Sequence, residues 1–109
     1  MADLLGTFEQ AVLLTVVKLA DDAYGRAIFR ELQVGLHREV AAGAIYATLD
    51  RLEQKGLLAS HLDAGTPLRG GRVRRFYRLT GVGARALNAS KTALEQMWSA
   101  MRWPLGVRP

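Results

Sequence analysis

The chain has 109 residues, the length of one ordinary domain, and half of them are hydrophobic, which is enough to build a core. It has no cysteine, so the sequence excludes disulfides and thiolate metal sites. Charges interrupt every apolar run, and even Leu4 to Ala20 contains Glu9 and Lys18. We therefore expect neither a membrane span nor a signal peptide, and we expect the chain to be cytoplasmic.

The net charge of +5 is distributed unevenly along the chain. Residues 66–109 hold nine basic residues against one acid, Glu95, which leaves residues 1–65 with a net charge of −3. Five of the arginines fall between residues 69 and 78, with no acid among them. A basic surface on part of a small domain suits a polyanion, although a solvated face that aids solubility is the alternative.

The first predicted helix runs from about Phe8 to Ala20. Residues 7–10 have the form of a capping box, with Thr7 as the N-cap and Gln10 reaching back. The helix is apolar on more than one face: one face carries Phe8, Val12, Val16 and Leu19, and another carries Leu13, Leu14 and Val17. The second face predicts either contact with a second subunit or a central position for this helix.

The second helix is predicted from about Tyr24 to Leu36, with Asp22 as its N-cap. Gly25 permits close packing of helices. Tyr24 fits a core position better than a phosphate contact. The link at residues 37–40 is a place for a short strand.

The stretch from Ala41 to Leu58 predicts a third helix that is followed by a strand. Ile45, Leu49 and Leu52 fall at i, i+4 and i+7 and form one apolar stripe. Gly56 sits where a helix ends in a left-handed cap. Because the first turn carries only small side chains, this helix has the shape needed to enter the major groove of DNA.

Two antiparallel strands are predicted over residues 57–62 and 73–79, joined by a loop rich in glycine and proline. Arginines on such a loop can reach the sugar–phosphate backbone or the minor groove. A last helix is predicted from its N-cap, Thr80, to about Trp103. A sevenfold spacing relates Leu87, Leu94 and Met101, with Met97 and Trp98 between them, and it indicates an apolar seam that a three-helix core leaves uncovered.

This order of elements predicts a mainly α fold with a small β-hairpin. We expect a winged helix-turn-helix DNA-binding domain over residues 1–80, followed by a C-terminal dimerisation helix and tail over residues 81–109. Gly43 to Leu57 resembles the recognition-helix signature of the PadR family of bacterial transcriptional regulators. Gly70 to Thr80, followed by Gly83 and Leu87, resembles that family's wing and final strand, and Tyr24-Gly25 lies upstream of both. The resemblance is to a short member of the family with a single C-terminal helix.

The resemblance implies a DNA-binding transcriptional regulator that acts as a homodimer on double-stranded DNA, with repression the expected role and no cofactor. The third helix would enter the major groove, and the wing would hold phosphates. The DNA contacts expected are Gly43, Ala44, Tyr46, Ala47, Thr48, Arg51, Arg69, Arg72 and Arg74. The dimer contacts expected are Leu13, Leu14, Val17, Leu87, Leu94, Met97, Trp98 and Met101.

The start of the third helix departs from the family pattern, in which serine or threonine is frequent. Ala41, Ala42 and Ala44 offer no hydroxyl, so the helix loses a side-chain N-cap worth about 1 kcal/mol. Two other functions stay open. The family resemblance allows a small aromatic effector that stacks on Trp98 at the dimer interface, where simple packing is the alternative, and a winged helix can also be a protein-interaction module.

Neither an enzyme nor a metal protein is expected. The sequence shows no pairing of a nucleophile with a base and no nucleotide-binding loop. The two histidines, His37 and His61, lack the spacing of a metal site, so we expect them at the surface.

Overall fold

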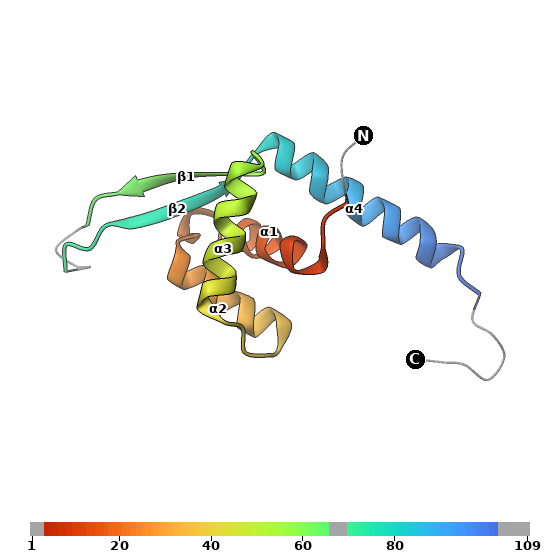
Figure 1. Cartoon of the computed structure of the whole chain (residues 1–109), viewed down its shortest axis with the longest axis horizontal. Helices are drawn as coiled ribbons and strands as arrows, with labels where there is room; N and C mark the ends of the chain where they lie inside the picture. Colours follow the sequence, from red (N-terminus) through yellow and green to blue (C-terminus); the bar gives the residue numbers. More distant parts are fainter. Residues whose placement is uncertain (1–3, 66–69, 103–109) are drawn as a thin grey trace.

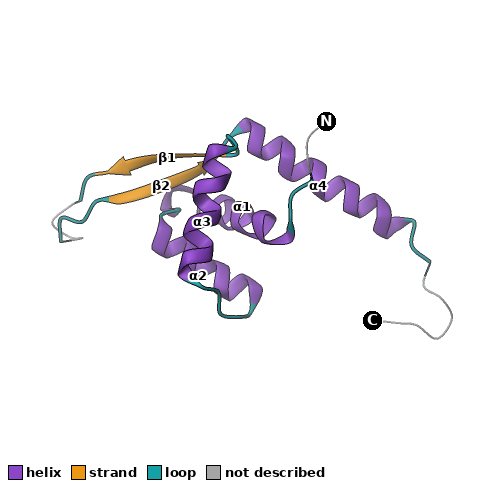
Figure 2. Ribbon diagram, in the orientation of Figure 1, coloured by secondary structure: helices purple, strands orange, loops and turns teal. Residues whose placement is uncertain are grey.

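The computed structural model describes residues 4–65 and 70–102. It is mainly helical with one antiparallel hairpin, and this confirms the predicted fold class (Figure 2). The elements are α1 (Thr7–Leu19), the 3-10 helix η1 (Ala20–Asp22), α2 (Gly25–Leu36), α3 (Ala42–Gln54), β1 (Leu58–Asp63), β2 (Arg74–Leu79) and α4 (Gly81–Ser99). No helix among the described residues is long and apolar enough to cross a bilayer.

Two elements project from the helical body in opposite directions (Figure 1). The β1–β2 hairpin extends to one side and α4 to the other, with α3 between them and in front of α1. The chain is consequently elongated, with principal extents of 62 × 31 × 21 Å. The hairpin and the end of α4 therefore lie at opposite ends of the molecule.

The first three helices and the base of the hairpin share one hydrophobic core. The predicted stripe of α3, Ile45, Leu49 and Leu52, is fully buried in it. The remaining buried apolar residues are Leu5, Val12, Leu13, Val16, Ala23, Ile28, Leu32, Leu57, Leu58, Tyr77 and Ala86. Gly56 has a φ of 77°, the left-handed conformation predicted for the end of α3.

The start of α1 differs from the predicted capping box. The helix begins at Thr7, and Gly6 is its N-cap. The backbone N–H of Gly6 donates to Glu9 Oε1 at 3.3 Å, so Glu9 makes the return contact that was expected of Gln10. Gln10 instead donates from Nε2 to the carbonyl of Leu5 at 2.8 Å.

The two apolar faces of α1 divide differently from the prediction. Leu13 is fully buried in the chain's own core, which corrects its assignment to the dimer interface. Leu14 and Val17 are 55% and 50% exposed. A helix with three neighbouring apolar residues does not reveal from sequence which of them its own core will take.

The start of α2 holds the hairpin in place. Tyr24, and not Asp22, is the N-cap of α2, since Asp22 lies in η1. Tyr24 forms an isolated antiparallel bridge with Phe76, and the backbone N–H of Tyr77 donates to the carbonyl of Ala23 at 2.8 Å. The strand-like partner of the hairpin is therefore this segment, and the link at residues 37–40 forms no strand.

The hairpin runs one residue later than predicted at the start of each strand. Its register pairs Leu58 with Leu79 at the base and Asp63 with Arg74 toward the tip. One face of the hairpin continues the core, because Leu58 and Tyr77 are buried. The end of the hairpin at Asp63 and Arg74 projects away from the helices (Figure 1).

Close contacts fix the start of α4 to the body. Thr80 caps the helix as predicted, since its Oγ1 accepts from the N–H of Gly83 at 2.9 Å. A Cβ added at Gly83 would lie 2.1 Å from the carbonyl oxygen of Leu57, so only glycine fits there. Further along, the buried hydroxyl of Ser90 accepts from the N–H of Leu5 at 2.9 Å. The helix ends at Ser99, before the predicted end at Trp103, which lies outside the described residues.

Candidate nucleic-acid interface

The outer face of α3 is smooth, as its sequence predicts. Gly43, Ala44 and Ala47 are exposed. No side-chain hydrogen bond caps the helix at Ala41, so the missing hydroxyl is not replaced there. The preceding turn is held instead by Gln33, whose Oε1 accepts from the N–H of Val40 at 3.0 Å. A low outer surface of this kind allows the helix backbone to come close to a groove.

Thr48 does not belong to this outer face. It is only 4% exposed, because it follows Ile45 by three residues and precedes Leu52 by four and so lies on the same side of the helix. Its hydroxyl accepts from Nη2 of Arg51 at 3.4 Å. Burial removes Thr48 from the expected DNA contacts.

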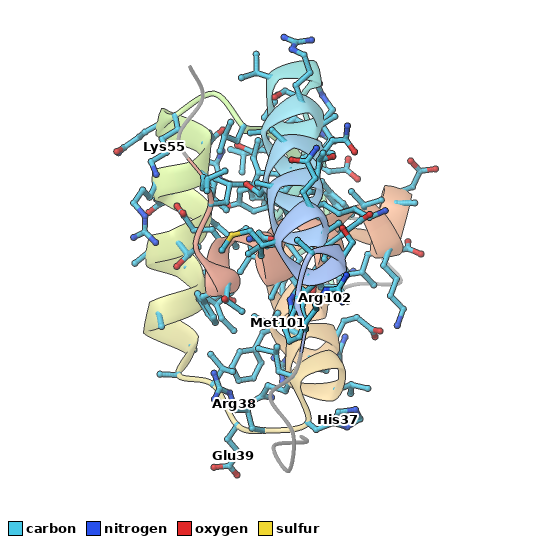
Figure 3. All side chains as sticks on the ribbon, turned by 90° about the vertical axis from the view of Figure 1, so that its right-hand side faces the viewer. His37, Arg38, Glu39, Lys55, Met101 and Arg102 are labelled. Atoms are coloured by element: carbon cyan, nitrogen blue, oxygen red, sulfur yellow. The ribbon has the colours of Figure 1, made fainter. Side chains whose placement is uncertain are left out.

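Arg51 braces α3 against α1. Its Nε lies 3.5 Å from Oε2 of Glu9, and Nζ of Lys55 lies 3.1 Å from the same oxygen. Figure 3 shows Lys55 at one end of α3, with the α2–α3 turn at the other. Arg51 is thus part of a three-residue ion cluster, although its side chain stays half exposed.

The same ion cluster changes the titration of Glu9. Burial acts to raise the pKa of this carboxyl, but the hydrogen bonds from Lys55 and from the N–H of Gly6, with the charge of Lys55, outweigh burial. The pKa of Glu9 is consequently held below its usual value of 4.5. The carboxylate therefore stays ionised at neutral pH and ties α1 to the end of α3.

Tyr24 joins the hairpin to α2 and is half-buried, where a core position was predicted. The guanidinium carbon of Arg74 lies 4.1 Å from the centre of its ring, and the ring centre of Phe76 lies 5.6 Å away. Arg30 donates from Nη2 to the Tyr24 hydroxyl at 3.2 Å. Tyr24 thus contacts cations from two elements that are far apart in the sequence.

The two histidines are exposed, as predicted. His61 stacks on Phe76, with ring centres 5.8 Å apart and an interplanar angle of 17°. In the part of the chain that the structure describes, no group of three or more metal-ligating side chains occurs. The imidazole of His61 therefore serves as a packing partner of Phe76 on the surface of the hairpin.

A hollow of about 370 Å³ lies between α3, the start of α2 and β2, and we call it the arginine–tyrosine hollow. It is lined by Tyr24, Gly25, Arg26, Tyr46, Arg72, Val73, Arg74, Arg75 and Tyr77. A Cβ at Gly25 would lie 2.8 Å from Cε1 of Tyr46, so this glycine lets the Tyr46 ring lie against α2. The hollow brings α3 and the arginines of the hairpin to one surface.

The cations of the hollow differ in their partners. Arg75 donates from Nη1 to Ser60 Oγ at 2.9 Å, and the Ser60 hydroxyl bonds in turn to Glu53. Arg26 and Arg74 make no salt bridge with any carboxylate of residues 4–65 and 70–102. Arg72 is exposed, whereas Arg69 lies outside the described residues. The positive charge of Arg26 and Arg74 is therefore left without an acidic partner in this part of the chain.

Tyr77 lies at the inner side of the hollow. Burial raises the pKa of its phenol, and the negative charge of Asp50 raises it further. The phenol is therefore protonated at neutral pH, and Tyr77 itself adds no charge to the hollow.

A second exposed surface is apolar and lies on α4 and just beyond its end. Leu94, Met97, Trp98 and Met101 are between 47% and 70% exposed. Figure 3, viewed along the end of α4, shows Met101 beyond the last turn of that helix. Leu87 is different, because it is half-buried against the chain's own core, so only part of its side chain is free for a second subunit.

Comparison with known proteins identifies close counterparts of this architecture. Residues 13–89 match the family model described as the transcriptional regulator PadR-like family. Transcriptional regulator Rv3488 of Mycobacterium tuberculosis is 38% identical over 89 residues, which cover 80% of this chain and 78% of that protein.

Solved structures agree with the sequence match. A PadR family transcriptional regulator from Eggerthella lenta has a TM-score of 0.65 at 31% identity, covering 81% of this chain and 74% of the other. A complex structure of RosR from H. salinarum has a TM-score of 0.69 at 29% identity, covering 89% and 79%. The matched residues include α2, α3 and the hairpin, which together form the arginine–tyrosine hollow.

Proposed function

We propose a specific mode of DNA binding for this chain, which belongs to the transcriptional regulator PadR-like family. Members of this family are DNA-binding transcriptional regulators and not enzymes. In the proposed mode, two copies form a homodimer, the outer face of α3 enters the major groove, and the hairpin arginines contact the sugar–phosphate backbone. The proposed place of action is the cytoplasm.

One observation carries the proposal: Tyr46, which precedes Ala47 on α3, lines the same hollow as the hairpin arginines. A helix in the major groove and a basic hairpin beside it can then meet neighbouring parts of one duplex. The methyl groups of Ala44 and Ala47 can contact a thymine methyl, which is the direct readout that an alanine face allows. The contacts that we propose are Gly43, Ala44, Tyr46, Ala47 and Arg51 on α3, and Arg72 and Arg74 on the hairpin, with Arg69 carried over from the sequence prediction.

We propose that residues 1–80 hold DNA and residues 81–109 pair the two copies. The exposed apolar side chains of α4 support this division, and the exposed Leu14 and Val17 on α1 would add to the pairing surface. Covering such side chains removes apolar surface from water, which favours association by about 25 cal/mol per Å² buried. A two-fold dimer would present two α3 helices to half-sites about 34 Å apart, one turn of the duplex.

Ala47→Glu tests the placement of α3. A carboxylate facing the bases and phosphates should weaken binding to a selected operator by about tenfold or more, with little change in melting temperature. Val34→Glu, at an exposed position on α2, is the matched control. Fluorescence anisotropy measures both, and wild-type affinity for the Ala47 variant would remove α3 from the interface.

Repression is the regulatory outcome that we propose, because occupancy of a promoter by a bound dimer is sufficient to block transcription. A reporter gene behind the selected operator tests this directly. Its expression should fall when the chain is supplied. A rise in expression would identify an activator.

Trp98 supports a second candidate function, the binding of an aromatic effector at the dimer interface. Its side chain is 63% exposed and lies next to Met97 on α4, and sulfur and aromatic groups suit an apolar ring. Tryptophan fluorescence titrated with aromatic compounds tests the idea. If neither quenching nor a spectral shift is observed, the effector hypothesis is wrong and Trp98 serves only in interface packing.

A further inference from the structure

We propose that the arginine–tyrosine hollow seats one phosphodiester group of the DNA backbone in each half-site. The inference rests on the proposed DNA binding. It adds Arg26, which sequence reasoning did not select, as a DNA-binding residue, and it assigns Tyr46 to the backbone and not to a base. It also gives Tyr24 a role as a positioning residue.

The charges around the hollow favour an anion. Arg26 lies on α2 and Arg74 on β2, and both side chains line the same hollow without a salt bridge to a carboxylate of the described residues. Two like charges that share a surface repel each other, and an anion between them converts that repulsion into attraction. Guanidinium groups match phosphate oxygens in geometry, because two parallel N–H groups can donate to them.

The position of Tyr46 supplies a neutral donor to the same anion. Its ring lies against Gly25, where any larger residue would displace it, and 45% of the side chain remains exposed. This packing directs the tyrosine toward α2 and the hollow rather than straight out from α3. Tyrosine hydroxyls are regular donors to DNA phosphates.

The acids near the hollow limit where the anion can lie. The charges of Asp50 and Glu53 act on Tyr77 at the inner side, and Glu53 is bonded to Ser60. A phosphate would be repelled from that side. The favourable position is the mouth of the hollow, next to Arg26 and Arg74.

Arg74 is held ready for this contact by Tyr24. Its guanidinium carbon lies 4.1 Å from the Tyr24 ring centre, while Arg30 donates to the hydroxyl of the same tyrosine. An arginine that is already stacked loses less side-chain entropy on binding than a free one. Arg74 is therefore positioned for phosphate binding before DNA binds.

A DNA backbone is the source of phosphate that the arrangement favours. Tyr46 of α3 and the hairpin arginines line the hollow together, so a duplex that contacts both elements would bring its backbone close to it. A free phosphate ion could use the same donors. The two sources are separated by the measurements below.

The test combines charge removal on the DNA with charge removal on the protein. Each phosphate of a selected operator is replaced in turn by an uncharged methylphosphonate, and affinity is measured by anisotropy for the wild type, Arg26→Ala and Tyr46→Phe. Arg85→Ala, on α4 and away from the hollow, is the matched control. Far-UV circular dichroism and melting curves establish that all four proteins are folded.

One methylphosphonate position per half-site should weaken wild-type binding about tenfold, yet weaken Arg26→Ala by much less, because that contact is already lost. Arg26→Ala should also lower the slope of log affinity against log salt by about 0.9 for each phosphate released. Tyr46→Phe should show the same coupled position with a smaller effect. Arg85→Ala should show none.

The outcomes distinguish failure of the phosphate site from failure of the proposed DNA binding on which it rests. If the wild type binds no duplex, DNA binding itself is wrong. If it binds and every methylphosphonate weakens Arg26→Ala and the wild type equally, only the phosphate site is wrong. If no coupled position appears but inorganic phosphate, at constant ionic strength, raises the melting temperature of the wild type and not of Arg26→Ala, the hollow binds a free anion and the assignment to DNA is overturned.

Discussion

The two projecting ends of this molecule differ in the chemistry of their exposed side chains: the hairpin end is positively charged and the end of α4 is apolar. The hairpin end carries Arg74, which makes no salt bridge with a carboxylate of the described residues, while the outer part of α4 carries large apolar side chains that are exposed. Charge that lacks a counter-charge favours a polyanion, and exposed apolar surface favours another apolar surface. The comparison supports the proposal that one end binds DNA and the other pairs with a second copy.

The ends also differ in how the body holds them. The hairpin is fixed by backbone hydrogen bonding to the segment before α2 and by the tilted contact between the rings of Tyr24 and Phe76. The helix α4 is fixed mainly at its start, by Thr80 and Gly83, and by the bond from Leu5 to Ser90. Its last two turns extend away from the body (Figure 1). A firm hairpin and an extended helix suit DNA contact and subunit pairing respectively.

The largest effect is expected from breaking the apolar end. Leu94→Glu combined with Trp98→Glu should convert the dimer into monomers, because two carboxylates would be buried in the interface. Operator affinity should fall by about a hundredfold or more, since the two half-sites would then be bound independently. Analytical ultracentrifugation and anisotropy measure the two effects. Gln96→Glu is the charge control, and a stable dimer in the double variant would disprove the interface.

The contact between the start of α4 and the base of the hairpin is expected to show the next largest effect when it is disturbed. Gly83→Ala places a Cβ 2.1 Å from the carbonyl oxygen of Leu57, so α4 must shift away from the hairpin base. Overpacking of this kind costs about 1–3 kcal/mol, which lowers the melting temperature by roughly 5–20 °C in a domain of this size. Gly81→Ala, where the nearest atom is 3.5 Å away on a flexible arginine, should melt close to the wild type. Equal melting temperatures would show that this contact is not tightly packed.

A smaller effect isolates the hairpin end. Tyr24→Leu removes the ring under Arg74 but keeps an apolar side chain against Phe76. The contact is worth about 0.5–1 kcal/mol at an exposed site, so operator affinity should fall by roughly two- to fivefold with no change in dimerisation. Tyr24→Phe, which keeps the ring, should bind almost as the wild type does. A loss of affinity in both variants would assign the effect to the hydroxyl and Arg30.

The smallest effect concerns the brace between α1 and α3. The pKa of Glu9 is lowered on folding, so its contribution to stability is present above the unfolded-state pKa, near 4.5, and is lost as pH falls through the lower folded-state value. Glu9→Gln should therefore be less stable than the wild type at pH 7, and the difference should shrink as pH falls below about 4.5. Urea unfolding at several pH values measures it. A difference that is independent of pH would mean that the ion cluster adds no stability.

The sequence predicted those features that depend on local spacing. The stripe of Ile45, Leu49 and Leu52, the left-handed Gly56 and the cap at Thr80 each follow from residues within two turns of one another, and the structure has all three. The burial of Thr48 does not follow from its polar side chain, but its spacing from Ile45 and Leu52 places it on the buried side of the helix.

Long-range contacts were beyond a local pattern. Arg74 lies 50 residues after Tyr24 in the chain, and Lys55 lies 46 after Glu9, so no periodicity brings either pair together. The hollow, and with it Arg26, becomes visible only when α2 and β2 are placed side by side. Leu13 is a related case, because the choice between a chain's own core and a partner depends on the whole packing of α1.

Selection of duplexes from a random pool by the full chain tests the central claim most directly. We predict enrichment of a palindromic sequence whose half-sites are centred about 10 base pairs apart, as two α3 helices of a two-fold dimer require. Enrichment of a single unrepeated half-site, or no enrichment at low salt, would contradict a dimer that reads DNA with α3 and grips it with the hairpin.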